Sequence, residues 1–593
     1  MARSPAMDRP LRRRTLLGAA LIALAALAVY GPTVTYEFVF DDHVQIERNP
    51  WLRAPDGFQL FLTRPFWGFY QDRGKGPSNY YRPAFGIVYS LVARTFGIAA
   101  AAFHTVSVAL HVILSLLTAY AARRLVPKGR KDAAGLAAGL LFAVHPAHAE
   151  AVAWVGGQAD LLAALFALAA LLAYLAGKDG GWRRQAAWVG PFAYLLACLS
   201  KETGVALILV LGALEVAEWR REGSLGAALG RSAARLAPYG LVLAAYVALR
   251  VHALGGFAPR DYHVTASLGG ALFYAGALFA RYLGFLVVPF PTRVLAGVPI
   301  PSPGSPIAIA GLLAGVLIVA GLGWAAWNGR ARREIVLPVA WIMAFLVPVL
   351  AADSIGGSNF AERYLYIPSI GFAWLAGALW SRAPVRRGLA AAGLVLIAAA
   401  GAAAWARSGI YRSDLTLFRA ALRTSPGSEI ARNNLGMALY NRGHLEEAER
   451  EYREALRLSP KAVPPLANLG ILLEKKGDVA GAKAAFEETL RRVPTHAVSA
   501  VHLARFQAAE GDRAGAARRL DTLFAAGGES YEALVERADL WLREGRPERA
   551  IPLLEKAVSR FPDWDRGWSV LARAYAAQGE TAKAAEAARR GDQ

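Results

Sequence analysis

Two adjacent carboxylates, Asp41 and Asp42, stand directly after the first long apolar run of the chain. A carboxylate at a boundary between lipid and water can have a raised pKa and act as a general base. Two neighbouring acids can also divide the work, one accepting a proton and the other orienting a ligand or a metal ion. The alternative interpretation is a solvated loop or a helix N-cap, which aspartate forms readily.

An arginine between aromatic residues follows in the same loop, in the segment 79–83 (Asn-Tyr-Tyr-Arg-Pro). Arg82 can bind a phosphate or a carboxylate through two parallel hydrogen bonds. Tyr81 and Arg82 can equally anchor the loop at the level of the lipid headgroups. Both interpretations stay open.

Three further polar residues, His145, His148 and Glu150, come at the end of a later apolar run. Ionisable side chains at membrane depth cost free energy and therefore suggest a function. They have the chemistry of metal ligands, but Pro146 disturbs regular helical spacing between the two histidines. We favour a role for these residues in substrate contacts or in a polar network, and we predict no metal site. We expect no certain cofactor. A divalent metal ion stays open as the alternative.

Two short ionic segments complete the set of candidate residues. Lys201-Glu202 lies between two apolar runs, and Glu362-Arg363 lies late in the apolar part of the chain. Lys201 and Arg363 can neutralise the phosphate of a membrane lipid, and the neighbouring glutamates are candidate substrate contacts. For Lys201 the alternatives are an ion pair with Glu202 and simple snorkelling toward the headgroups.

Composition indicates a membrane protein. The chain has 593 residues, of which 55% are hydrophobic, and the apolar residues are concentrated before about residue 407. The formal net charge is +21, but much of the excess Lys and Arg occupies short loops between apolar runs, where such residues set membrane orientation. No nucleic-acid motif is visible, so we expect lipid and protein partners and no nucleic acid. The single cysteine, Cys198, excludes an internal disulfide framework.

The apolar runs predict a polytopic helical domain, because a crossing needs about 20 mostly apolar residues. Eleven spans are expected near 15–33, 99–122, 133–151, 159–177, 185–199, 203–219, 236–252, 305–327, 335–351, 366–381 and 388–406. The first is expected to be a retained helix rather than a cleaved signal peptide. We expect segment 269–290 to be an interfacial or re-entrant helix and segment 84–96 to lie along the outer membrane surface.

Basic loops such as Arg123-Arg124 and Arg332-Arg333 predict a cytoplasmic N-terminus in the plasma (inner) membrane. Residues 34–98 and the C-terminal part are then external. With eleven spans, all the candidate residues above lie on one face and the basic loops on the other. This shared placement indicates an external site for an anionic, membrane-bound substrate.

The C-terminal part contains an internal repeat. Its period of 34 residues is marked by Gly443, Gly477, Gly511, Gly545 and Gly579. This period and pattern are typical of tetratricopeptide repeats, which bind peptides or proteins on a concave face or act as structural spacers. We therefore predict an all-α chain with a membrane domain at 1–406, a half-repeat junction at 407–426 and about five repeats at 427–593.

Taken together, these segments resemble the C-type multi-pass glycosyltransferases. More narrowly, the chain resembles the transmembrane, tetratricopeptide-containing O-mannosyltransferases and their bacterial relatives. The matching segments are Phe40-Asp41-Asp42, Tyr81-Arg82-Pro83, His145 to Trp154, Ser200-Lys201-Glu202 and Glu362 to Pro368, in the same order. The resemblance implies that Asp41 is the catalytic base, with Asp42 beside it, and that Arg363, Lys201 and Arg82 bind the donor phosphate.

The resemblance also implies a reaction. A polyprenyl-phosphate-linked sugar would be transferred to an acceptor hydroxyl, first of all of protein Ser or Thr, while the repeats bind the acceptor or a partner. The lipid phosphate is a good leaving group, so a metal is not obligatory. Gln158 stands where the family would have arginine, which leaves the sugar and the acceptor open. The alternatives are a non-catalytic membrane-anchored scaffold for envelope assembly and a transferase that modifies lipid or glycan.

Overall fold

The protein is all-helical wherever the structure describes it. This computed structural model describes residues 8–71, 78–180, 184–222, 224–256, 268–292, 294, 304–330, 332–350, 360–384, 387–561 and 564–591. Within these ranges there are α-helices and short 3-10 or π turns but no β-strand. The predicted all-α fold is therefore confirmed.

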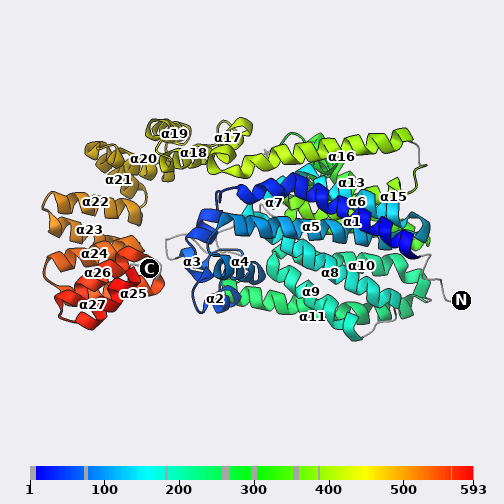
Figure 1. Ribbon diagram of the computed structural model, residues 1–593, viewed down its shortest axis with the longest axis horizontal. Helices are drawn as coiled ribbons and strands as arrows, with labels where there is room; N and C mark the ends of the chain where they lie inside the picture. The colour runs from blue at the N-terminus through cyan, green and yellow to red at the C-terminus, as the bar shows by residue number, and fades with distance from the viewer. Residues whose placement is uncertain are drawn as a thin grey trace. The chain divides into compact units, whose positions relative to one another are not determined.

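The chain forms two compact units. The first consists of Met1–Arg48, Pro55–Phe66 and Ser78–Thr424, and the second of Asn49–Ala54, Trp67–Pro77 and Ser425–Gln593. Each unit has its own helices and is described separately below (Figure 1).

The first unit contains the apolar helices. They are α1 (Asp8–Tyr30), α2 (Gly57–Thr63), α4 (Pro83–Phe96), α5 (Ala100–Leu125), α6 (Lys131–Val144), α7 (Ala149–Ala153), α8 (Gln158–Gly180), α9 (Arg184–Ser200), α10 (Leu207–Glu218), α11 (Leu225–Leu254), α12 (Leu268–Val287), α13 (Pro306–Trp327), α14 (Arg333–Leu350), α15 (Tyr366–Trp380), α16 (Arg387–Ser408) and α17 (Asp414–Thr424). Short turns connect them at functionally interesting places: η1 (Gly31–Thr35), η2 (His43–Glu47), η5 (Pro146–His148), η6 (Val155–Gly157), η7 (Glu202–Ala206), η10 (Glu362–Leu365) and η11 (Gly409–Arg412).

Eight helical segments of the described chain are long and apolar enough to cross a membrane. They are Thr15–Thr35, Ala100–Leu125, Val155–Gly180, Leu225–Leu254, Gly269–Val287, Pro306–Trp327, Arg333–Leu350 and Arg387–Arg412. A ninth is the pair Lys128–Val144 and Pro146–Ala153, which is bent by 49°. The bend follows from Pro146, because proline has no N–H for the helical hydrogen bond and its ring clashes with the preceding turn.

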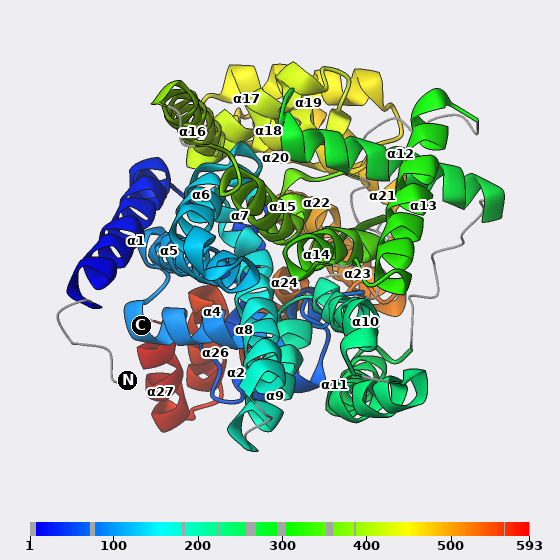
Figure 2. The same cartoon turned by 90° about the vertical axis from the view of Figure 1, so that its right-hand side faces the viewer.

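Within the described residues, length and composition therefore identify fewer spans than the eleven predicted. Segments 185–199 and 366–381 form α9 and α15 with nearly the predicted bounds, and segment 203–219 forms α10, which begins at Leu207 because the tight turn η7 takes up the first residues expected for it. All three helices are shorter than 18 residues, the length of the shortest of the eight segments above. Gly269–Val287, expected to be interfacial or re-entrant, meets the criteria of a full span. Figure 2 shows this helix, α12, lengthwise. Residue 351, the end of another predicted span, lies outside the described residues.

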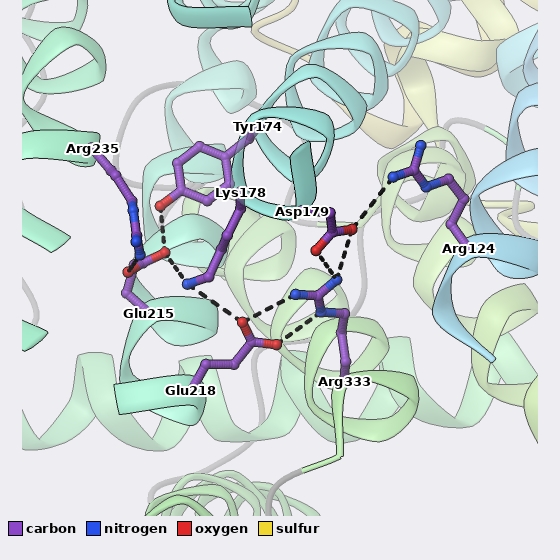
Figure 3. Close-up of polar contacts among 8 residues, drawn as sticks. All are labelled: Arg124, Tyr174, Lys178, Asp179, Glu215, Glu218, Arg235 and Arg333. Atoms are coloured by element: carbon purple, nitrogen blue, oxygen red, sulfur yellow. Dashed lines mark hydrogen bonds and ion pairs between the residues drawn. The ribbon is translucent and has the colours of Figure 1, made fainter. Parts of the chain in front are cut away.

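The helices of the first unit have two chemically different ends. At one end, where α8 and α10 finish and α14 begins, Arg333 donates to Glu218 (Nε to Oε1, 2.8 Å) and to Asp179 (Nη1 to Oδ1, 2.9 Å). Lys178 pairs with Glu215 in the same place. We call this set the Arg333 network: Arg124, Tyr174, Lys178, Asp179, Glu215, Glu218, Arg235 and Arg333 (Figure 3).

The candidate site residues lie at the other end. Helix α8 has Asp160 in its first turn and Lys178 in its last. Its 23 residues make it about 35 Å long. Lys201 pairs with Asp160, whereas the Arg333 network surrounds Lys178. The two polar clusters are therefore separated by the length of a membrane-spanning helix.

The second unit contains five helix pairs. These are α18 (Glu429–Asn441) with α19 (Leu445–Leu458), α20 (Pro464–Lys475) with α21 (Val479–Arg492), α22 (Ala497–Ala509) with α23 (Arg513–Ala525), α24 (Tyr531–Arg543) with α25 (Pro547–Arg560), and α26 (Asp565–Ala577) with α27 (Thr581–Gly591). The unit also contains η3 (Pro50–Leu52) and α3 (Gly68–Gln71). Each repeated glycine, for example Gly443 with φ 82°, ends the first helix of a pair in the left-handed conformation that glycine adopts without strain.

Candidate functional site

The turn that carries the acid pair is held by its second aspartate. Asp42 is completely buried, and its Oδ1 accepts a hydrogen bond from the N–H of Gly156 (2.9 Å) while its Oδ2 accepts one from Val39 (3.2 Å). Burial raises the pKa of Asp42 to about 8, against the effect of these two N–H groups. Asp42 is therefore mostly protonated at neutral pH and shapes the turn.

Asp41 is the more accessible member of the pair. Its side chain is half-buried, and its main-chain carbonyl accepts hydrogen bonds from Val44 (3.0 Å) and Gln45 (2.8 Å) that start the turn η2. The preceding residue, Phe40, has a φ of 55°, which costs a non-glycine residue about 1–3 kcal/mol. Such strain is retained where the surrounding contacts fix the backbone, and here it sets the direction of Asp41.

A single carboxylate from far along the chain supplies those contacts. Asp414, at the start of α17, accepts from the N–H of Phe40 (2.8 Å) and pairs with Nε2 of His43 (2.9 Å). Nδ1 of His43 lies 2.6 Å from Glu47, and the hydrogen bonds to Asp414 and Glu47 raise the pKa of His43 to about 10. Sequence reasoning did not identify Asp414, because no local signal links residues so distant in the chain.

Arg82, Tyr81 and Glu202 come together as one contact group. Glu202 accepts from Nε of Arg82 (2.9 Å) and from the main-chain N–H of Tyr81 (3.2 Å). Nη1 of Arg250 lies 3.5 Å from the same carboxylate. Burial acts to raise the pKa of Glu202, but Arg82 and Arg250 outweigh it and hold the pKa below its usual value. Glu202 is thus a charged anchor that orients two arginines.

Lys201 forms a buried ion pair with Asp160. Its Nζ lies 2.5 Å from Oδ1 of Asp160, and only about one-twentieth of either side chain is exposed. Burial lowers the pKa of Lys201 to about 8; Asp160 raises this pKa, and Arg82 and Arg363 lower it. Because both arginines act on Lys201, the three predicted phosphate ligands lie close to one another.

Arg363 is oriented by Glu150 and by aromatic rings. Glu150 accepts from the main-chain N–H of Arg363 (3.0 Å) and also binds its guanidinium. The guanidinium carbon lies 5.0 Å from the ring centre of Tyr364 and 5.2 Å from that of Trp154. Nζ of Lys201 lies 5.1 Å from the same Tyr364 ring, so one aromatic side chain contacts two of the cations.

Two aromatic residues connect the cations to the acid pair. The rings of Trp154 and Phe40 are 6.2 Å apart, so Trp154 lies between Arg363 and the turn. Tyr89 is buried, and burial raises its pKa; Asp42 and Asp41 raise it further, while Arg82 opposes them. Asp41, Asp42 and Arg82 therefore all lie within electrostatic range of Tyr89.

The two predicted histidines are used inside the helical core. Nε2 of His145 lies 2.9 Å from the carbonyl oxygen of Leu286 in α12, and Nε2 of His148 lies 2.7 Å from Oγ of Ser369 in α15. Both rings are buried. These contacts tie the bent segment to neighbouring helices. Within the described residues, no group of three His, Cys, Asp or Glu side chains is arranged to hold a metal ion.

Glu362 is also buried, and it pairs with Arg407 of α16 (Oε2 to Nη1, 3.4 Å). Arg407 and Arg250 are two site-end residues that sequence reasoning missed. An available signal was the arginine within each otherwise apolar helix, because a charge in such a place is costly and is retained for a specific contact.

Comparison with known proteins identifies the repeats. Models described as tetratricopeptide repeat match residues 430–462, 503–564 and 542–592. The solved structure of MamA, residues 41 to the end, from Desulfovibrio magneticus RS-1 is 22% identical and covers 28% of this chain and 92% of that chain, with a TM-score of 0.24.

The chain also has curated relatives. The chain is 36% identical over 253 residues to human Protein O-mannosyl-transferase TMTC1, which covers 39% of this chain and 28% of the relative. It is 28% identical over 489 residues to human Protein O-mannosyl-transferase TMTC4, covering 73% and 65% respectively. The chain spans less than two thirds of the length of these relatives. The predicted resemblance to the transmembrane, tetratricopeptide-containing O-mannosyltransferases is confirmed.

Proposed function

We propose that this chain is an integral-membrane glycosyltransferase that moves a sugar from a polyprenyl-phosphate-linked donor to a hydroxyl group of a protein. The names of the relatives support transfer of a sugar to protein. The observation that carries the proposal is the convergence of Arg82, Lys201 and Arg363 at the end of the first unit that also holds the accessible Asp41. This arrangement suits a reaction in which a phosphate leaves and a hydroxyl loses its proton.

In the proposed reaction, Asp41 accepts the proton of a Ser or Thr hydroxyl. The hydroxyl oxygen forms a bond to the anomeric carbon while the bond from that carbon to the lipid phosphate oxygen breaks. The negative charge that develops on the departing phosphate is stabilised by Arg82, Lys201 and Arg363, which are already oriented before the reaction. Asp41 then returns its proton to water.

The carboxylates next to the cations have a different role from the one predicted. Glu150 and Glu202 were expected to contact substrate, and we now propose that they orient Arg363 and Arg82, as Asp160 orients Lys201. Fixed partners reduce the reorganisation needed when the phosphate arrives. Asp42, whose oxygens bind main-chain N–H groups, keeps Asp41 in place.

We further propose that the site end faces the external side of the plasma (inner) membrane and that the N-terminus is cytoplasmic. The separation of the site from the basic Arg333 network by the length of α8 supports this orientation, since excess Lys and Arg favour the cytoplasmic face. The repeats then lie on the external side, where they bind the acceptor or a partner.

Reconstituted transfer tests the proposed function. The purified full chain is incubated with polyprenyl-phosphate mannose and an unfolded acceptor protein, and sugar on protein is measured by intact mass. Asp41→Asn is expected to lower the rate at least about a hundredfold, the scale of a lost general base. Asp56→Asn, an exposed aspartate in the same loop region, is the matched control and leaves the rate unchanged.

Three outcomes contradict parts of the proposal. Equal rates for Asp41→Asn and wild type remove Asp41 as the base. If sugar is transferred only to lipid or glycan, the acceptor is not a protein, and the proposed acceptor class is wrong. No transfer of any supplied sugar, combined with intact partner binding by both the wild type and Asp41→Asn, supports a non-catalytic scaffold.

A further inference from the structure

Three tryptophans and two arginines mark the ends of two apolar helices. We call them the Trp–Arg cluster: Trp219, Arg220, Trp324, Trp327 and Arg330. The first two open the turn η8 (Trp219–Glu222) directly after α10, and the other tryptophans lie in the last turn of α13. Because the segment Pro306–Trp327 is long and apolar enough to cross a membrane, we expect the cluster at the level where hydrocarbon meets lipid headgroups.

The two helix ends are held together by apolar packing. Ala217 of α10 packs against a buried pair formed by Ala326 of α13 and Val336 of α14. Just after α13, Gly329 has a φ of 64°, the left-handed conformation that ends many helices. A β-carbon at Gly329 would lie 3.6 Å from Cδ of Arg220. Arg220 therefore lies beside the turn that carries the second arginine of the cluster.

Each arginine lies over indole rings. The guanidinium carbon of Arg220 is 5.2 Å from the ring centre of Trp219 and 6.0 Å from that of Trp327. The centres of these two rings are themselves 6.0 Å apart. The guanidinium carbon of Arg330 is 5.2 Å from the ring centre of Trp324. Because a ring contacts the flat face of a guanidinium, the N–H groups at its edge stay available for an anion.

Within the part of the chain that the structure describes, no carboxylate neutralises these two arginines. Arg220 and Arg330 are exposed, and neither forms an ion pair with a described acid. The neighbouring Arg333 network differs, because Arg333 donates to both Glu218 and Asp179. The Trp–Arg cluster therefore presents two uncompensated positive charges in fixed positions.

Exposed apolar side chains continue from the cluster along α13. Trp324 and Trp327 are 58% and 64% exposed, and Leu313 and Leu317 are exposed as well. Leu317 stands seven residues before Trp324 and Leu313 four residues earlier, so the three lie on one face of the helix. A soluble anion would leave this face uncovered. A molecule with an anionic headgroup and an acyl chain matches both the charges and the apolar face.

We propose that the Trp–Arg cluster binds an anionic phospholipid. The lipid phosphate accepts hydrogen bonds from Arg220 and Arg330, and an acyl chain lies along the exposed leucines of α13. A zwitterionic lipid carries a cation beside its phosphate, which the two arginines repel. Glu218, which directly precedes Trp219, belongs to the Arg333 network, so the cluster lies at the end of the first unit opposite to the candidate site. The proposal therefore does not rest on the proposed function.

Native mass spectrometry of the purified, delipidated full chain tests the proposal. The chain is titrated with dioctanoyl phosphatidylglycerol or dioctanoyl phosphatidylcholine, and the population of the complex with one lipid gives an apparent Kd. Arg220→Gln should weaken binding of phosphatidylglycerol at least about tenfold, the scale of a hydrogen bond to a charged group, and leave phosphatidylcholine unaffected. Arg330→Gln should do the same. Lys128→Gln removes an exposed charge at the same end, and this matched control should change Kd by at most about twofold.

A ring variant separates the built site from general attraction by charge. Trp327→Leu keeps both arginines but removes one ring beside Arg220, so it should weaken phosphatidylglycerol binding about twofold to fivefold. The substituted side chains are exposed, so each variant should keep the Tm of the wild type in neutral detergent.

Three results would overturn the proposal. They are equal binding of the two lipids by the wild type, equal weakening by Lys128→Gln and Arg220→Gln, and competition by glycerol 3-phosphate as strong as by phosphatidylglycerol. The last result would show a site for soluble phosphate. Asp41→Asn should bind phosphatidylglycerol normally, so a failure of the proposed chemistry leaves this test readable.

Discussion

Asp414 and His43 form an ion pair in which Oδ2 and Nε2 are 2.9 Å apart, although the two residues lie at opposite ends of the first unit's sequence. The other oxygen of Asp414 binds the N–H of Phe40. One carboxylate thus holds the residues on both sides of Asp41 and Asp42. Because Asp414 begins the helix that leads into the repeats, the position of α17 sets the position of the proposed base.

The first prediction concerns Asp414→Asn. The asparagine oxygen can keep the bond to Phe40, but the charge partner of His43 is lost, so we expect kcat to fall about tenfold while KM for the donor stays unchanged. The pKa of His43 is raised to about 10 in the folded protein. The ion pair of protonated His43 therefore stabilises the folded state fully below pH about 6.5, and this stabilisation is lost as the pH rises through about 10. The difference in Tm between wild type and variant should therefore be largest near pH about 6 and vanish above about 10.

Asp56→Asn is the control, with no pH-dependent difference in Tm expected. A larger KM with unchanged kcat would show that Asp414 acts on donor binding instead of positioning the acid turn. A Tm difference that persists above pH about 10 would show that the lost contact is not the His43 pair.

The second prediction concerns Asp42→Asn. Its two oxygens accept from Val39 and Gly156, and an amide nitrogen placed against either N–H leaves that group unsatisfied, which costs about 1–3 kcal/mol. The pKa of Asp42 is raised to about 8, so its stabilising effect is complete below pH about 4 and is lost as the pH rises through about 8. The free energy of unfolding of the variant should thus lie well below wild type at pH about 6 and closer to it at pH about 9.

Chemical unfolding followed by tryptophan fluorescence measures the free energy of unfolding of both proteins at the two pH values. Asp41→Asn is the comparison, because its half-exposed side chain should affect the rate much more than the stability. A deficit for Asp42→Asn that grows with pH would contradict the assignment of a buried, mostly neutral acid.

The features of the fold that were predicted from the sequence are those that depend on residues close to one another in the chain. Apolar runs and the glycine period are local, so they predicted the helical class and the repeats. The start of α10 depended instead on the tight turn η7, which carries Glu202 into contact with Arg82. This contact joins residues 120 positions apart, so no local pattern reports it.

The site shows the same division. Arg82, Lys201 and Arg363 were predicted as phosphate ligands from their residue types and neighbours, and in the structure the three cations lie close together. Glu202 and Glu150, the carboxylate partners of Arg82 and Arg363, were predicted as substrate contacts, because sequence shows a carboxylate but not which cation faces it. Asp160, the partner of Lys201, was not predicted as a site residue. Asp414 had no signal at all, since its two bonds exist only after the chain has folded.

The third prediction separates the structural role of Lys201 from its role toward the donor. Lys201→Met leaves the buried Asp160 without its partner and should cost about 3–5 kcal/mol of stability. In the double variant Lys201→Met with Asp160→Asn both charges are gone, so most of the stability should return. KM for the donor should nevertheless stay at least about tenfold above wild type, because one phosphate ligand is missing. A double variant with normal KM would restrict Lys201 to a structural role.

The fourth prediction concerns the Arg333 network at the opposite end. Glu215 accepts from Tyr174 (2.6 Å), Ser232 (2.7 Å) and Arg235 (3.0 Å), and it also binds Lys178. Glu215→Ala removes the nearer carboxylate partner of the buried Lys178 and a carboxylate partner of Arg235, and it should cost about 3 kcal/mol. KM for the donor should not change, because the site is a helix length away. Tm and KM measured on the same preparation test both parts.

An exposed ion pair at the same end provides the control. Asp132 is half exposed and pairs with Arg123. Asp132→Ala should lower the free energy of unfolding by at most about 1 kcal/mol. Equal losses for Glu215→Ala and Asp132→Ala would mean that burial does not decide the strength of these pairs.

The fifth prediction concerns orientation. Asp56 lies in the loop between α1 and α5 at the site end, and Lys128 lies between α5 and α6 at the opposite end; both are exposed. In a Cys198→Ala background, which removes the one native and buried thiol, a membrane-impermeant maleimide should label Asp56→Cys in intact cells and Lys128→Cys only after permeabilisation. A donor lipid can reach Arg82, Lys201 and Arg363 only from the leaflet on the site's own side. The reverse labelling pattern would therefore move the proposed reaction to the cytoplasmic leaflet and exclude external acceptors.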